Sequence, residues 1–136
     1  MRVVLDTNIF VSGIHWKGIP SKIIRAMELD KFESVTSDEI LDEFVKVMKE
    51  FKKPMTEEDI LRWENFIIAK SEVVMPKEDF KAVKDDPKDD KIVNTAVEGK
   101  CDYVISKDKK HLLKLKEFRG IKIIPPEEFI KLLDSE

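Results

Sequence analysis

The chain opens with RVVLDTN at residues 2–8, an apolar run that ends in a carboxylate. Its apolar residues do not alternate with polar ones, which predicts a β-strand at residues 2–6 that is buried on both faces. Asp6 stands at the carboxyl end of this strand, where ligands gather in open α/β sheets. Asp6 is either the cap of the next helix or a site residue. Because Thr7 or Asn8 offers a cap in its place, a functional role is favoured.

Strand and helix patterns alternate along the rest of the chain. Further strands are expected at residues 32–36, 72–75, 103–105 and 121–124. Helices are expected at residues 7–14, 20–29, 38–51 and 89–100, after the cap Thr56, as a short turn near His111, and after Pro125-Pro126. This alternation predicts an α/β fold: a three-layer α/β/α arrangement around a central, mostly parallel sheet. The length of 136 residues fits one domain over residues 1–136.

The composition limits the classes of function. No apolar stretch is long enough to span a membrane, and no secretory signal is visible, so a cytoplasmic protein is expected. Cys101 is the only cysteine, which excludes an internal disulfide and fits a reducing compartment. A surface rich in Lys and Glu, without Gln, leans toward a thermophile. The net charge of −3 argues against coating nucleic acid by bulk basicity, but a local lysine patch is compatible with it.

Four acids stand out by their position in the predicted elements. Asp6 and Asp108 follow strands, and Glu43 lies at the edge of the inward stripe of the helix at residues 38–51. Asp89 projects onto the apolar face of its helix, whereas Asp90 is rotated by about 100° toward the rim. Each has an alternative without function: a surface position for Glu43, and a helix cap for Asp89 and Asp108.

Together, these acids point to a metal site. Two unit charges about 4 Å apart repel by roughly 4 kcal/mol at an effective dielectric constant near 20, so clustered carboxylates take up protons or bind cations. Oxygen ligands without Cys or His suit Mg²⁺ or Mn²⁺, and such ions promote attack of water on phosphodiesters. His15 and His111 have no metal-binding spacing and are expected to be structural or surface residues.

Four motifs in this order resemble those of the PIN-domain nucleases, and more narrowly the toxins of toxin–antitoxin systems in that family (VapC-like). They cover nearly the whole chain: VVLDTNIFVSG, SDEILDEFVKVM, DPKDDKIVNTAVEGKCDYVISKDKKHL and IKIIPPEEFIKLL. The resemblance implies a ribonuclease that uses Mg²⁺ or Mn²⁺, pairs with an antitoxin protein and forms a homodimer.

The resemblance also implies roles for individual residues. The acidic quartet matches Asp6, Glu43, Asp89 and Asp108, with the neighbouring Asp90 as the alternative third acid or a supporting residue. Small polar residues that support the quartet match Thr7, Asn8 and Ser106. The lysines next to Asp108 are expected to contact the RNA backbone, although a solvated face explains them equally well: Lys107, Lys109, Lys110 and Lys114.

Two other classes of function compete with a nuclease. Phosphatases that form an aspartyl intermediate carry D-x-D after the first strand, and Asn8 stands where the second Asp is required. A PIN-like scaffold without catalysis, which binds RNA or protein, is the other alternative. The presence of all four acids argues against it.

Overall fold

The computed structural model of the protein describes residues 1–51, 55–84 and 86–136. Its strands are β1 (Arg2–Leu5), β2 (Glu33–Thr36), β3 (Ser71–Val73), β4 (Tyr103–Ile105), β5 (Glu117–Phe118) and β6 (Ile121–Ile124). Its helices are α1 (Thr7–His15), α2 (Ile19–Glu28), α3 (Asp38–Glu50), α4 (Glu57–Ala69), α5 (Asp90–Glu98), α6 (Leu112–Leu115) and α7 (Pro126–Asp134), and a 3₁₀ turn, η1 (Pro87–Asp89), precedes α5.

The strands form one sheet in the order β3-β2-β1-β4-β6-β5. All neighbouring strands are parallel except the pair β5–β6. The predicted α/β fold with a mostly parallel sheet is therefore confirmed. Strand β5 was not expected from the sequence. It reaches β6 through Arg119 and Gly120, which both have positive φ angles, as the central residues of a tight hairpin turn do.

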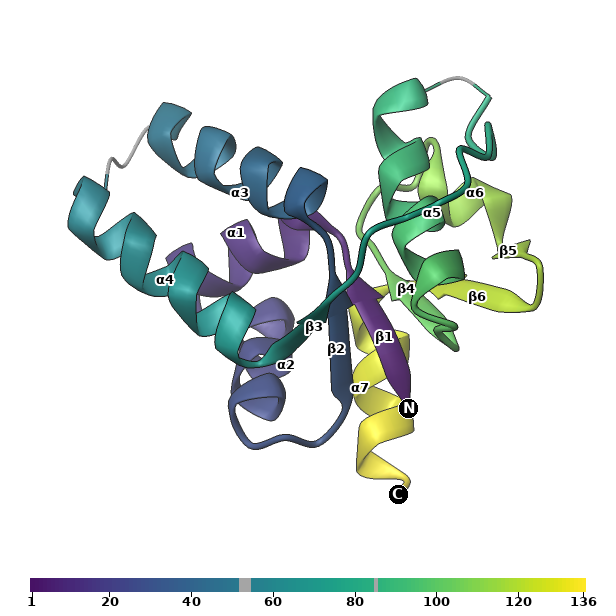
Figure 1. Cartoon of the computed structure of the whole chain (residues 1–136). Coiled ribbons are helices and arrows are strands. Elements are labelled where there is room, and N and C mark those ends of the chain that lie inside the picture. The colour runs from purple at the N-terminus through teal and green to yellow at the C-terminus, as the bar shows by residue number, and fades with distance from the viewer. Residues whose placement is uncertain (52–54, 85) are drawn as a thin grey trace.

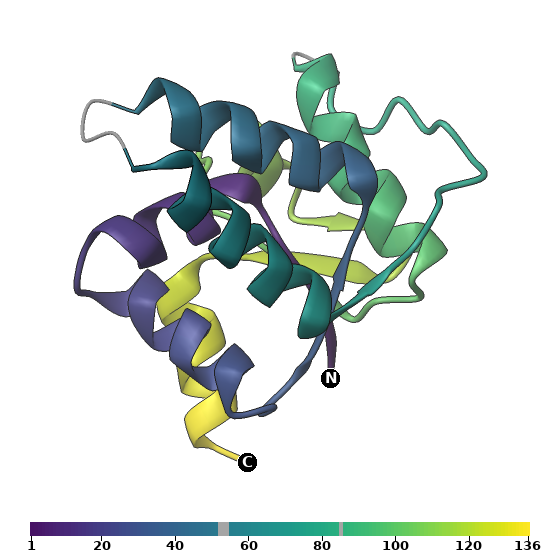
Figure 2. The same ribbon diagram turned by 60° about the vertical axis from the view of Figure 1, so that its left-hand side comes forward.

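Helices cover both faces of the sheet (Figure 1), with α1, α2, α3, α4 and α7 on one face and α5 and α6 on the other. The turned view shows α3 and α4 lying over α1 and α2 (Figure 2). Phe10, Phe44 and Phe129 fill the core under the larger layer, and each is at most 1% exposed. The predicted two-faced burial of β1 is confirmed, since its last three residues are at most 1% exposed. None of the helices in the described residues is long and apolar enough to cross a membrane.

The chain reverses its direction across the sheet next to β1. Strands β2 and β3 are added on one side of β1, and α5 then carries the chain back to β4 on the other side. A reversal of this kind opens a crevice at the carboxyl ends of the two central strands. Leu5 pairs with Ile105 in the parallel register, so Asp6 and Ser106 leave the sheet side by side.

Two predicted helix caps have different outcomes. Thr56 caps α4 as predicted, because its hydroxyl accepts a hydrogen bond from the Asp59 amide at 3.1 Å. Thr7 does not cap α1. Asp6 occupies the cap position and Thr7 is the first helical residue, but the Asp6 side chain makes no capping bond. The Asp6 carboxylate is thus available for other contacts.

Candidate metal centre

Asp6 is a buried carboxylate at the carboxyl end of β1, and it is only 4% exposed. The Ser106 hydroxyl donates a hydrogen bond to its Oδ2 at 2.8 Å, and the Thr7 amide also donates to it. Burial raises the pKa of Asp6 to about 6, against the effect of the Ser106 hydrogen bond and with help from the charge of Glu43. A bound cation would therefore compensate the negative charge of this buried carboxylate.

Ser106 connects the ends of β1 and β4. Besides donating to Asp6, its hydroxyl accepts a hydrogen bond from the Asp108 amide at 3.0 Å. The Asp108 carboxylate in turn accepts from the amides of Lys110 at 3.1 Å and His111 at 3.2 Å. Asp108 therefore caps the turn before α6, and the same carboxyl group reaches the site.

Asp89 and Asp108 lie close together, and their carboxyl groups shift each other's pKa in opposite directions. Burial, a hydrogen bond to Asp108 and the charge of Asp6 together raise the pKa of Asp89 to about 8. Burial also acts to raise the pKa of Asp108, but hydrogen bonds from Asp89 and from the His111 and Leu112 amides outweigh it and lower that pKa. A divalent cation between two such carboxyl groups would favour the charged form of both, as a proton does for neither.

Two further residues join this pair, Asp86 and His111. One ligand atom from each of Asp86, Asp89, Asp108 and His111 lies within 4.8 Å of the others. His111 Nδ1 is 3.5 Å from Asp86 Oδ2 and 3.4 Å from Asp108 Oδ2. From the sequence, only a structural or surface role is expected for His111, and Asp86 is not singled out.

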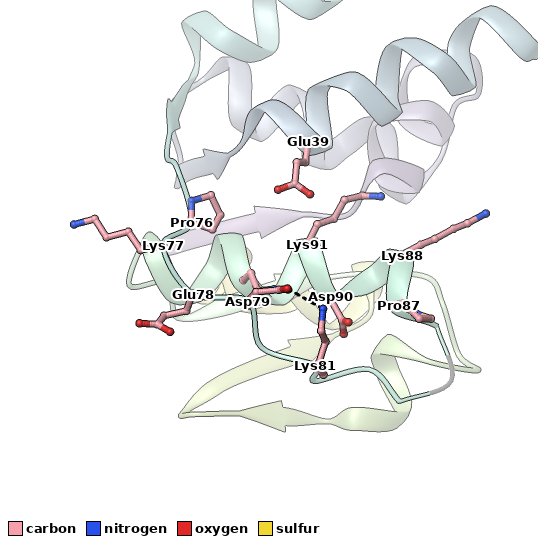
Figure 3. A pocket seen from close by; sticks show the side chains of 11 residues that line it. Glu39, Pro76, Lys77, Glu78, Asp79, Lys81, Pro87, Lys88, Asp90 and Lys91 are labelled. Atoms are coloured by element: carbon pink, nitrogen blue, oxygen red, sulfur yellow. Dashed lines mark hydrogen bonds and ion pairs between the residues drawn. The ribbon is translucent and has the colours of Figure 1, made fainter.

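Glu43 lies across the crevice on α3, and its side chain is 29% exposed. It forms an ion pair with Lys91, which extends from α5 toward α3 (Figure 3). Its charge also reaches Asp6, whose pKa it helps to raise. The Lys91 ammonium is therefore a cation held by one of the four predicted acids.

The expected rim position of Asp90 is wrong. Asp90 is only 5% exposed, and its Oδ1 accepts a hydrogen bond from the Val83 amide at 2.8 Å. The helix begins at Asp90, after the 3₁₀ turn, so a helical projection does not extend back to Asp89. Asp89 is partly exposed and turns to the acids, whereas Asp90 turns to the chain that precedes the turn.

Side chains of α5 bind the backbone of the connection that precedes the 3₁₀ turn, between β3 and η1. Asn94 accepts from the Phe80 amide at 2.8 Å, and Glu98 accepts from the Lys77 amide at 3.0 Å. With Asp90, these residues are spaced four apart and so lie on one face of the helix. Figure 3 shows this connection beside α5, around a hollow of about 320 Å³ that Glu39 of α3 faces. The three contacts fix the chain that leads to Asp86 and Asp89.

The other predicted site residues lie close to these acids. Thr7 is buried, and its Oγ1 makes no hydrogen bond within the part of the chain that the structure describes. Asn8 is exposed in the first turn of α1. The predicted RNA-binding lysines are all exposed: Lys107, Lys109, Lys110 and Lys114. Lys107 reaches back to α1, where its Nζ donates to Ser12 Oγ at 3.1 Å.

The donor set fits a hard divalent cation. Carboxylate oxygens dominate, which are the ligands that Mg²⁺ and Mn²⁺ prefer, and the buried Thr7 hydroxyl without a partner is a further oxygen beside Asp6. The cluster that the geometry selects differs in part from the predicted quartet. It shares Asp89 and Asp108 with it, while Asp6 is linked to it through Ser106.

Comparison with known proteins finds a matching family model and a similar fold. A family model described as "PIN domain" matches residues 2–110. Among solved structures, the crystal structure of PAE2754 from Pyrobaculum aerophilum superposes with a TM-score of 0.62 at 14% sequence identity, over 99% of this chain and 90% of that one. At this level of identity, the similarity shows the fold alone. A search of curated proteins finds no match.

Proposed function

Because this chain belongs to the PIN-domain family, whose members are generally metal-dependent nucleases, we propose that it is a metal-dependent endoribonuclease. We further propose that it is the toxin of a toxin–antitoxin pair, as in VapC-like proteins. The observation that carries the proposal is the connected set of acids at the reversal point of the sheet. Ser106 joins Asp6 to Asp108, and the carboxyl group of Asp89 lies within 4.8 Å of that of Asp108.

The proposed ligands of Mg²⁺ or Mn²⁺ are the four predicted acids, Asp6, Glu43, Asp89 and Asp108. When bound, such an ion lowers the pKa of water and neutralises the charge of a leaving oxygen. The protein's own residues position these ligands. Ser106 orients Asp6, and the backbone amides at His111 and Leu112 orient Asp108. Glu43 pairs with Lys91, whose ammonium group would compete with a bound ion for this carboxylate.

Exposed lysines surround the acids and are proposed to bind the RNA backbone. Lys107 and Lys109 flank Asp108 directly, and Lys110 and Lys114 lie on the turn and helix that follow. Phosphate contacts of this kind position a nucleic acid without reading its sequence. A local patch beside the site is compatible with the net charge of −3.

The test is cleavage of a panel of structured RNAs with Mn²⁺, with Mg²⁺ and with EDTA. We expect the wild type to cleave only with metal and Asp6→Asn to be inactive. Asp42→Asn is the matched control, since Asp42 is exposed on α3 beside Glu43. Equal cleavage by the wild type and Asp6→Asn would overturn the assignment of Asp6. Hydrolysis of a small chromogenic phosphate ester without RNA cleavage would instead indicate a phosphatase.

The partners proposed with this function are an antitoxin protein, which blocks the site, and a second copy of the chain in the cytoplasm. A gene for a small DNA-binding protein directly upstream would support the toxin role. Sedimentation of the purified protein measures the oligomeric state, and a monomer at micromolar concentration would contradict the homodimer.

A further inference from the structure

A second hollow, of about 330 Å³, opens beside Asp108 on the side of α1 and α3. Polar residues line the part next to the acids: Asn8, Ser12, Lys107 and Asp108. Aromatic rings line the far part, where Trp16 follows α1 and Phe51 follows α3. One end of the hollow thus belongs to the candidate metal centre and the other is an aromatic surface.

Trp16 is the distinctive residue of this surface, because 49% of it is exposed. Its ring lies 5.4 Å from that of Phe51 at an angle of 67°, and 5.5 Å from that of His15. These neighbours support the indole without covering it. A large exposed aromatic residue is an informative exception among surface residues, whereas a scattered aliphatic one is not.

The polar end of the hollow suits a nucleotide. Lys107 donates to Ser12 at 3.1 Å, which holds its ammonium group at the boundary between the hollow and Asp108. An ammonium group binds a phosphate oxygen, and the amide of the exposed Asn8 both donates and accepts hydrogen bonds, as base edges require. An aromatic side chain of a protein partner would fill the apolar end but would bring no anion to Lys107.

We propose that an unpaired nucleotide of the substrate, next to the phosphate that is cleaved, stacks its base on Trp16 in this hollow and places a backbone phosphate at Lys107. Trp16 is therefore assigned as a substrate-binding residue outside the acids. The inference rests on the proposed nuclease function for the identity of the reacting phosphate. The stacking surface itself is a property of the hollow.

Size and stacking energy agree with a single base. Binding pockets for small ligands measure about 300–1,000 Å³, so this hollow lies at the lower end and accepts one base better than a base pair. Bases in an A-form duplex are stacked on one another and cannot reach an aromatic ring, whereas bases of loops splay out. Stacking on an aromatic side chain changes affinity by roughly 5- to 150-fold per base.

Binding is measured first in EDTA and at low salt, where it does not depend on catalysis. The chain contains two tryptophans, so Trp63→Phe leaves Trp16 as the only fluorescent indole. Trp63 lies on α4, away from the hollow, and the same substitution is the matched control for tryptophan loss. We expect an unstructured RNA oligonucleotide to quench the fluorescence of Trp16 and a blunt RNA duplex to leave it unchanged.

Substitution then tests the contribution of the ring. Trp16→Ala should weaken binding of the oligonucleotide about tenfold or more, and Trp16→Phe should restore it to within about threefold of the wild type. With Mn²⁺, Trp16→Ala should raise KM and leave kcat nearly unchanged, because the ring binds substrate without touching the reacting atoms. Circular dichroism verifies that Trp16→Ala is folded.

The outcomes separate the two proposals. If the wild type cleaves RNA and Trp16→Ala binds and cleaves equally well, the stacking site is overturned and the nuclease function stands. If duplex and single strand quench Trp16 equally, the preference for unpaired bases is overturned. If no variant cleaves RNA but binding in EDTA still depends on Trp16, the nuclease function fails and the stacking site is supported.

Discussion

The Ser106 hydroxyl donates to the Asp6 carboxylate at 2.8 Å, and this bond joins the two central strands of the sheet at their carboxyl ends. Both groups are buried, at 0% and 4% exposure. Since the same hydroxyl accepts from the Asp108 amide, the position of one serine sets the distance between two of the proposed ligands. Ser106 is therefore a candidate positioning residue, which would act on a bound metal ion only through the proposed ligands.

Replacement of Ser106 by alanine should lower the affinity for metal more than it lowers the stability of the fold. Loss of a group that orients metal ligands costs about 10- to 100-fold in metal affinity or activity. We expect Ser106→Ala to lose Mn²⁺ affinity in this range in calorimetric titration, because the Asp6 carboxylate loses the hydrogen bond that favours its charged form.

Ser71→Ala is the control for this variant. The Ser71 hydroxyl also forms a hydrogen bond with a side chain on a neighbouring strand, that of Ser34, at 2.8 Å. This pair joins β3 to β2, which lie beyond β1 from β4 in the strand order. It should bind Mn²⁺ as the wild type does. Unchanged Mn²⁺ affinity in Ser106→Ala would refute the positioning role.

Much of this arrangement could be predicted from the sequence. The unbroken apolar run before Asp6 indicated a central parallel strand, and the alternation of elements then determined where the carboxyl ends of β1 and β4 meet. Asp108 was reached by the same reasoning, from a short strand followed by an acid. Such inferences succeed because strand burial and chain alternation are local patterns with a single topological consequence.

The orientation of Asp89 and Asp90 was not predictable in the same way. Helical projection assigned Asp89 to the interior and Asp90 to the rim, but Pro87 starts a 3₁₀ turn that ends at Asp89 and changes the phase before the helix. Asp86 and His111 were missed because their proximity depends on the path of the long connection, which hydrogen bonds to α5 and packing of Val83 and Phe80 determine. Residues so far apart in the sequence form no short motif that could be recognised by its spacing.

The stability of the metal-free protein should depend on pH through Asp6 and Asp89. Their pKa values in the folded protein, about 6 and about 8, lie above those in the unfolded chain. The folded state therefore binds these protons more tightly, and the resulting stability is lost as the pH rises through both values. In EDTA, the free energy of unfolding by urea should fall between pH 5 and pH 9.

Metal should reverse this dependence on pH. Because Mn²⁺ replaces the protons, saturating Mn²⁺ should stabilise the protein more at pH 8 than at pH 6. Asp89→Asn, which imitates the protonated form, should flatten the metal-free curve above pH 7, whereas Asp42→Asn should not. A wild-type curve in EDTA that is flat across this range would contradict the raised pKa values of Asp6 and Asp89.

Removal of the Lys91 ammonium should tighten metal binding. Lys91 pairs with Glu43 and adds a positive charge at the position where a divalent cation is proposed. A unit charge and a divalent ion about 6 Å apart in water repel by about 1.4 kcal/mol, which corresponds to about tenfold in affinity. Lys91→Met should therefore bind Mn²⁺ about tenfold more tightly in calorimetry.

Lys88→Met is the matched control for charge, since Lys88 is exposed in the 3₁₀ turn just before the helix. It should change Mn²⁺ affinity much less than Lys91→Met does. If Lys91→Met binds Mn²⁺ more weakly than the wild type, Lys91 supports the site instead of competing with the metal, and the ion pair with Glu43 persists in the loaded protein.

Asp90 should contribute to the stability of the fold and should affect metal binding only indirectly. Its carboxylate satisfies the Val83 amide, and both residues are buried at 5% exposure. Loss of the partner of a buried amide costs about 1–3 kcal/mol. Asp90→Ala should lower the free energy of unfolding by urea by this amount, whereas Glu98→Ala, whose amide partner Lys77 is at the surface, should lower it by less. Since Asp89 is a proposed ligand and Asp90 holds the connection, Asp89→Ala should show the reverse pattern, with Mn²⁺ binding lost and stability in EDTA largely kept. Loss of Mn²⁺ binding in Asp90→Ala without loss of stability would instead make Asp90 the third acid.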